Sequence, residues 1–124
     1  MLGRRVNGAA LELLEDGNPI LCITEEVVDN VLIFHISGLL RNDLVYEFDD
    51  ELSAAVSIGK NIEIDMQGVT YIASASLKVL LRIQQKLDSE GNRMEMRLTN
   101  VPAEIMTVFK DSGLSDILDI AEND

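Results

Sequence analysis

The sequence predicts an α/β fold: a mixed β-sheet of four to five strands with helices packed mainly on one face. Residues 62–66 alternate apolar and acidic side chains with the period of two that is typical of a strand. Residues 74–90 instead repeat apolar side chains at the spacing of a helix. Strands joined through helices run parallel, whereas an opening hairpin adds an antiparallel pair, so we expect a mixed sheet.

The sheet is expected to begin with a hairpin formed by residues 20–28 and 31–36. Both segments are rich in β-branched residues, and Asp29-Asn30 between them is typical of a tight turn. Residues 1–18 are predicted to be a separate N-terminal leader or short helix, which a run of turn-forming residues ends. The domain itself is therefore assigned to residues 19–124.

Helices and a further strand are expected beyond this hairpin. Asn42 or Asp43 is predicted to cap a helix whose apolar residues recur at helical spacing and which Gly59 ends. Residues 94–98 alternate apolar and polar side chains and predict another half-covered strand. Two helices, the second of them short, are expected within residues 102–120.

The helix that begins near residue 74 has two distinct faces. With about 100° of rotation per residue, Ser76 falls among the apolar side chains and is expected to point into the core. Ser74 falls outside that arc, in line with Lys78 and Arg82 one and two turns further on. If Ser74 opens the helix, its hydroxyl lies beside unpaired backbone N–H groups, where a phosphate can be held. The alternative is that Ser74 serves only as a helix cap.

The composition argues against several kinds of function. A formal net charge of −12 and a pI near 4.3 disfavour nucleic-acid binding, which needs clustered Lys and Arg. No apolar run approaches the length of a membrane span, so no membrane association is expected. The single Cys22 cannot form an internal disulfide, which favours the reduced cytoplasm, and one histidine leaves no zinc-ligand cluster. We therefore expect neither a metal nor a cofactor.

Three other residues could carry chemistry, and each has a simpler structural interpretation. Asp65 could be an acceptor carboxylate at a strand end, but the chain lacks the acidic pair that would hold a metal beside it, so a solvent-facing position is favoured. Cys22 is expected to be packed and unreactive, and His35 to fill space near the core or the sheet edge. No nucleophile elbow or glycine-rich phosphate loop is present, and we expect a protein that is not an enzyme.

Residues 65–81 place a strand, a tight turn and then Ser74 at the start of a helix. Residues 36–40 add a glycine turn after the second strand, and residues 98–102 and 112–114 add later landmarks. Together these segments resemble the STAS domains, the family of bacterial anti-sigma factor antagonists, over most of the chain. By this match Ser74 occupies the position of the family's regulatory serine.

The resemblance implies a partner-switching regulator in the cytoplasm. The dephosphorylated domain would bind an anti-sigma factor with serine kinase activity and so free a sigma factor, whereas phosphorylation of Ser74 would release that partner. A separate phosphatase would restore the free state, and a weak homodimer is left open. The expected contact surface consists of Ser74 and its surroundings, namely Gly38, Leu39, Arg41, Asn42, Tyr71, Ala73, Ala75, Lys78 and Arg82.

Three positions depart from the family's pattern. Ala73 stands where Asp or Ser is frequent, Ser76 where Gly is usual, and Arg41 where an acidic residue is often found. These departures leave open a second interpretation, an adaptor domain that binds its partner constitutively and has lost the phosphoswitch. A third interpretation is a nucleotide-binding STAS domain, which the missing phosphate loop makes the weakest of the three.

Overall fold

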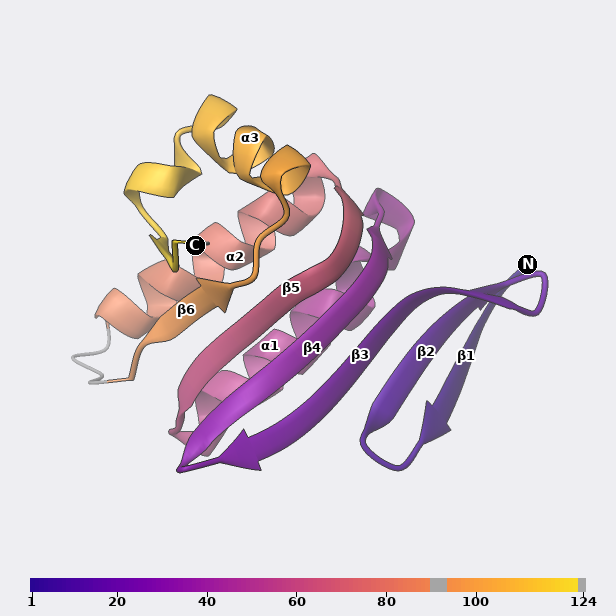
Figure 1. Ribbon diagram of the computed structural model, residues 1–124. Helices are drawn as coiled ribbons and strands as arrows, with labels where there is room; N and C mark the ends of the chain where they lie inside the picture. The colour runs from indigo at the N-terminus through magenta and orange to yellow at the C-terminus, as the bar shows by residue number, and fades with distance from the viewer. Residues whose placement is uncertain (90–93, 123–124) are drawn as a thin grey trace.

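The computed structural model describes residues 1–89 and 94–122, which form one twisted sheet with helices packed against it (Figure 1). In chain order its elements are β1 (Leu2–Asn7), β2 (Ala10–Glu15), β3 (Asn18–Val28), β4 (Val31–Leu40), the 3-10 turn η1 (Asn42–Leu44), α1 (Val45–Ile58), β5 (Asn61–Ile72), α2 (Ser74–Ser89), β6 (Met96–Thr99), α3 (Ala103–Asp111), the 3-10 turn η2 (Leu114–Asp116) and β7 (Asp119–Ile120).

The sheet is mixed, as predicted. Its strands lie in the order in which they follow one another in the sequence, from β1 to β7. The pairs from β1 to β4 are antiparallel, and the pairs from β4 to β7 are parallel. The described part of the chain contributes seven strands, so the expected number of four to five is wrong. The additional strands are the N-terminal pair β1 and β2 and the two-residue β7.

The N-terminal segment is a β-hairpin and not a helix. Apolar residues at positions 9–14 are compatible with either structure in so short a segment. In the structure Leu11 and Leu13 alternate along β2 and are buried, because β2 pairs with β3 at the edge of the main sheet. The short helix expected there is therefore wrong, whereas the division of the chain into a leader at residues 1–18 and a domain at residues 19–124 stays a prediction.

Most of the remaining elements agree with the sequence. Asp29 and Asn30 have φ of 51° and 66° and form the tight turn of the predicted hairpin β3–β4. Gly59, with φ of 81°, ends α1 as expected. The second, short helix expected within residues 102–120 is present only as the 3-10 helix η2, and the chain then forms β7, which pairs with β6. The predicted end of α2 near Glu90 lies outside the described residues.

Helices α1 and α2 lie side by side on one face of the sheet (Figure 1). The core between these layers contains fully buried side chains such as Phe34 of β4, Phe48 of α1 and Leu80 of α2. The other face of β4 and β5 carries partly exposed polar residues. Because β4 and β5 are parallel and each is followed by a helix, α1 and α2 begin at the same end of the molecule. Within the described residues, no helix is long and apolar enough to cross a membrane.

Candidate functional site

The first turn of α2 rests directly on the end of β4. The backbone N–H of Ala73 donates to the carbonyl of Leu40 at 2.9 Å, and the carbonyl of Ala73 accepts bonds from the N–H groups of Ser76 at 3.0 Å and Leu77 at 3.2 Å. Ala73 thus begins the helical hydrogen bonding, but its methyl group offers no acceptor to the free N–H groups of the first turn. Ser74 follows as the first residue of α2.

Asn42 supplies an acceptor that Ala73 lacks. Its Oδ1 accepts a hydrogen bond from the backbone N–H of Ala75 at 3.4 Å. The prediction that Asn42 or Asp43 caps α1 is wrong, because η1 intervenes and the N-cap of α1 is Leu44, which makes no side-chain capping bond. The loop before α1 therefore caps the neighbouring helix.

The two serines of this turn point in opposite directions, as the rotation along the helix predicted. Ser76 has no exposed surface, and its hydroxyl donates to the carbonyl of Leu40 at 3.4 Å. Ser74 is exposed, and among the described residues its hydroxyl makes no hydrogen bond. An unengaged hydroxyl at an exposed helix start is accessible to an enzyme that transfers a phosphoryl group.

The two basic residues in line with Ser74 differ in their surroundings. Arg82 forms an ion pair with Asp49 of α1, and Asp49 also accepts a hydrogen bond from Ser53 at 2.9 Å. Lys78, one turn from Ser74, is exposed and has no ion-pair partner in the described part of the chain. Of these two basic residues, Lys78 is thus the one that remains available to a ligand or a partner.

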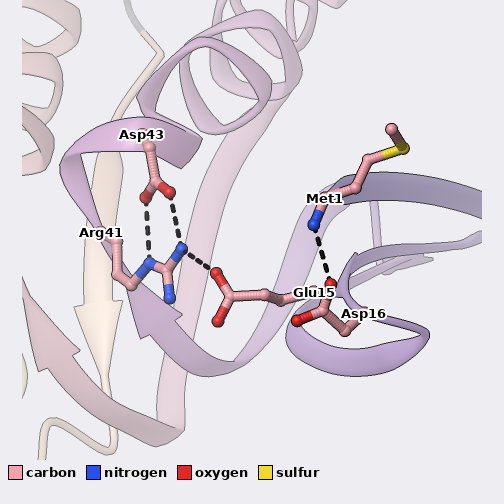
Figure 2. A network of polar contacts seen from close by, with 5 residues as sticks. All are labelled: Met1, Glu15, Asp16, Arg41 and Asp43. Atoms are coloured by element: carbon pink, nitrogen blue, oxygen red, sulfur yellow. Dashed lines mark hydrogen bonds and ion pairs between the residues drawn. The ribbon is translucent and has the colours of Figure 1, made fainter.

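Arg41 is held by two carboxylates within the molecule (Figure 2). One of its terminal nitrogens, Nη2, lies 2.8 Å from Glu15 Oε2 and 2.6 Å from Asp43 Oδ2, and its Nε lies 3.0 Å from Asp43 Oδ1. The hydrogen bonds from Arg41 hold the pKa of Asp43 below its usual value. Next to this cluster the amino group of Met1 pairs with Asp16 at 2.8 Å. Arg41 therefore fastens the N-terminal hairpin to the loop before α1.

The rest of the expected rim lies at the same end of the sheet. Gly38 has φ of 103°, and a Cβ there would lie 2.2 Å from the carbonyl oxygen of Ile20, so only glycine fits this bend in β4. Leu39 is half-buried and stands opposite Tyr71 of β5, whose side chain is 49% exposed. Whether these residues contact a partner stays a prediction.

His35 belongs to a polar cluster on the sheet face opposite α1 and α2. Its Nδ1 lies 2.7 Å from Asp65 Oδ2 and its Nε2 lies 2.7 Å from Glu26 Oε1. The hydrogen bond to Glu26 contributes most to a raised pKa of His35, and the hydrogen bond to Asp65 contributes next. Partial burial alone would raise the pKa of Asp65, but hydrogen bonds from His35, Asn100 and the Gln67 N–H together lower it. The expectation that His35 only fills space is therefore wrong.

No group of three or more His, Cys, Asp and Glu side chains within the described residues could hold a metal ion.

Three contributors to the Ser74 region were not predicted: Glu15 and Asp49, which engage the two arginines, and the acceptor role of Asn42 toward α2. The spacing of Asp49 and Ser53 by one helical turn shows which face of α1 they share. Their partners on other elements leave no local signal.

The comparisons with known proteins define the class of protein. Residues 23–123 match the STAS domain family, and the chain belongs to this family. Within it, the chain resembles the anti-sigma factor antagonists. A relative from Bordetella bronchiseptica, BtrV, bears the name of a candidate anti-sigma factor antagonist and is 26% identical over 102 residues, which cover 82% of this chain and 86% of BtrV.

Solved structures share the fold. The crystal structure of an anti-sigma factor antagonist from Mycobacterium paratuberculosis superimposes with a TM-score of 0.75 at 18% identity, covering 83% of this chain and 86% of that one. The structure of the Bacillus cell fate determinant SpoIIAA in its phosphorylated form gives a TM-score of 0.60 at 20% identity, covering 82% and 92%. The hairpin β1–β2 precedes the region that matches the family.

Proposed function

We propose that this chain is an anti-sigma factor antagonist that switches between partners through phosphorylation of Ser74. In its dephosphorylated form it binds an anti-sigma factor with serine kinase activity, and a sigma factor is freed. Phosphorylation of Ser74 by that kinase releases the domain, and a separate phosphatase restores the binding form.

The observation that carries the proposal is the position of Ser74. Its hydroxyl is exposed and unengaged among the described residues, at the first position of α2, whereas Ser76 two residues later is fully buried. Of the two serines in this turn, only Ser74 therefore offers its hydroxyl to a kinase. The acceptor from Asn42 also makes the first turn less dependent on a capping side chain at Ala73, the position that departs from the family's pattern.

The charges around Ser74 support a switch. A phosphate adds nearly two negative charges at neutral pH, and it would stand beside the positive end of the α2 dipole and one turn from Lys78. Such a group would be held locally by this helix start while it repels carboxylates of a bound partner. The SpoIIAA structure in a phosphorylated form shows that a protein of this fold carries such a modification.

Phosphorylation can be tested directly. The full-length chain is incubated with ATP and an extract of its source cells, and peptides that span residues 68–82 are mapped by mass spectrometry. We expect stoichiometric phosphate on Ser74, none in the matched Ser74→Ala variant, and none on the buried Ser76. The absence of phosphate from Ser74 in an extract that phosphorylates its other substrates would contradict the proposed switch.

A constitutive adaptor is the second candidate, and one observation favours it. Arg41 and Arg82, two of the three cations at this site, are already engaged by carboxylates of the same chain, so they are not free to hold a phosphate. An adaptor would bind its partner equally well whether position 74 is Ser, Ala or Asp. Weaker binding by Ser74→Asp alone would reject the adaptor.

A further inference from the structure

The aromatic residues of this chain are sorted between the core and one end of the molecule. The chain has three Phe, two Tyr and no Trp. Phe34, Phe48 and Phe109 are at most 1% exposed, whereas Tyr46 is 78% exposed and Tyr71 is 49% exposed. Both tyrosines therefore expose large side chains to solvent, and neither is needed to fill the core.

Both tyrosines lie at the end of the molecule where α2 begins. Tyr71 is the penultimate residue of β5, three residues before Ser74, and Tyr46 is the second residue of α1. The bond between Asn42 and Ala75 holds the starts of α1 and α2 close together. Figure 1 shows both helix starts at this end of the sheet.

The neighbours of Tyr46 on α2 follow from the contact between the two helices. Asp49 on α1 pairs with Arg82 on α2. Tyr46 precedes Asp49 by about one helical turn, and Lys78 precedes Arg82 by one turn in the same direction. Tyr46 is therefore placed across from Lys78.

We infer that Tyr46 anchors the partner interface of the proposed function, on which this inference rests. The tyrosine surface, defined as Tyr46, Tyr71, Ser74 and Lys78, would bind the anti-sigma factor through a protein face that offers apolar pockets to the two rings and a carboxylate to Lys78. Exposed tyrosines combine a rigid apolar ring with a polar tip and are enriched among the residues that dominate binding energy.

Charge complementarity defines the partner's face. Lys78, one turn from Ser74 on α2, lacks an ion-pair partner among the described residues, whereas Arg82 is neutralised by Asp49. A carboxylate of the partner can therefore pair with Lys78 without displacing an existing contact. Phosphate on Ser74 would compete for the same lysine and repel that carboxylate. Phosphorylation would therefore weaken the binding of the partner at this surface.

The chain provides a matched control for Tyr46. Ile58 is the last residue of the same helix, at its opposite end, and its side chain is 54% exposed. Removal of either exposed side chain leaves the core intact. A loss of affinity for Tyr46→Ala that Ile58→Ala does not share therefore reports the interface and not the helix.

The Ser74→Ala chain is immobilised and exposed to the source extract, and the protein that it retains is eluted with excess free chain. This protein is the probe: it is purified, and its binding to each variant is measured by calorimetric titration. We expect Tyr46→Ala to weaken binding about tenfold or more, with Tyr46→Phe retaining most of the affinity and Ile58→Ala within about twofold of the unmodified chain. Circular dichroism verifies that each variant is folded.

The outcomes separate this inference from the function on which it rests. If Ser74→Asp weakens binding but Tyr46→Ala binds as tightly as the unmodified chain, the role of Tyr46 is overturned and the switch stands. If Tyr46→Ala weakens binding and Ser74→Asp does not, the anchor stands and the switch is rejected. If no protein is retained and eluted specifically, both are overturned.

Discussion

Asn42 Oδ1 accepts a hydrogen bond from the backbone N–H of Ala75, although the two residues are 33 positions apart. This bond joins the loop that ends β4 to the first turn of α2, one residue beyond Ser74. It gives the helix an acceptor where the residue at the capping position, Ala73, provides none. The geometry of the candidate phosphorylation site therefore depends on a side chain from a different element.

Loss of this acceptor should destabilise the protein. Asn42→Ala removes the bond to Ala75, and we expect the free energy of unfolding in urea to fall by about 0.5–1 kcal/mol. Asn42→Asp keeps an acceptor at the positive end of the α2 dipole and should unfold close to the unmodified chain. Equal unfolding midpoints for Asn42→Ala and the unmodified chain would show that the bond contributes nothing.

The pKa of His35 should reveal its hydrogen bonds on the sheet face opposite α1 and α2. Hydrogen bonds to Glu26 and Asp65 raise the pKa of His35 from 6.5 in the folded state, so the stability it contributes is full below pH 6.5 and is lost as the pH rises through the folded pKa. As the single histidine, it gives an unambiguous NMR titration. We expect a midpoint above 6.5 that falls in Glu26→Gln, and a midpoint at or below 6.5 would contradict the observed contacts.

Glu51 on α1 should make the stability decrease between acidic and neutral pH. Partial burial is the largest cause that raises the pKa of Glu51 to about 7, and the neighbouring Glu25 is the second. The charge of Arg4 opposes this shift. A carboxyl group with a raised folded pKa stabilises the fold below its unfolded pKa of 4.5, and this contribution is lost as the pH rises through about 7. Glu51→Gln should therefore be more stable than the unmodified chain at pH 8.

Urea unfolding at pH 5 and pH 8 measures this effect. We expect the advantage of Glu51→Gln to appear at pH 8 and to shrink at pH 5, where the natural carboxyl group is already protonated in the folded state. Glu63→Gln on β5 serves as the control, because no ion pair involves Glu63 among the described residues. An advantage of equal size at both pH values would show that the effect is unrelated to titration.

The central part of the fold was predictable because its signals are local. Alternation along Ile62, Ile64 and Met66 defines β5, and the rotation of α2 separates Ser74 from Ser76. The hairpin β1–β2 was not predictable, since its leucines fit a helix until β3 is present as a neighbour. The strand β7 has only two residues, too few for any periodicity to appear.

The position of the candidate site was predictable from the sequence, but the side-chain contacts that hold its residues in place were not. The place of Ser74 at a helix start follows from the order of residues around it. The contacts of Asn42 with Ala75, Arg41 with Glu15 and Arg82 with Asp49 join residues that are 33, 26 and 33 positions apart. Their formation depends on how the elements pack, which no spacing along the chain encodes.

The affinity of the partner for the chain with and without phosphate on Ser74 is the most direct test of the proposed function. The kinase that modifies Ser74 would be purified, and its dissociation constant measured for unmodified and stoichiometrically phosphorylated protein without ATP. We predict that phosphorylation weakens binding about tenfold or more, because it adds nearly two negative charges to the contact surface. Equal dissociation constants for the two forms would contradict the switch and favour the constitutive adaptor.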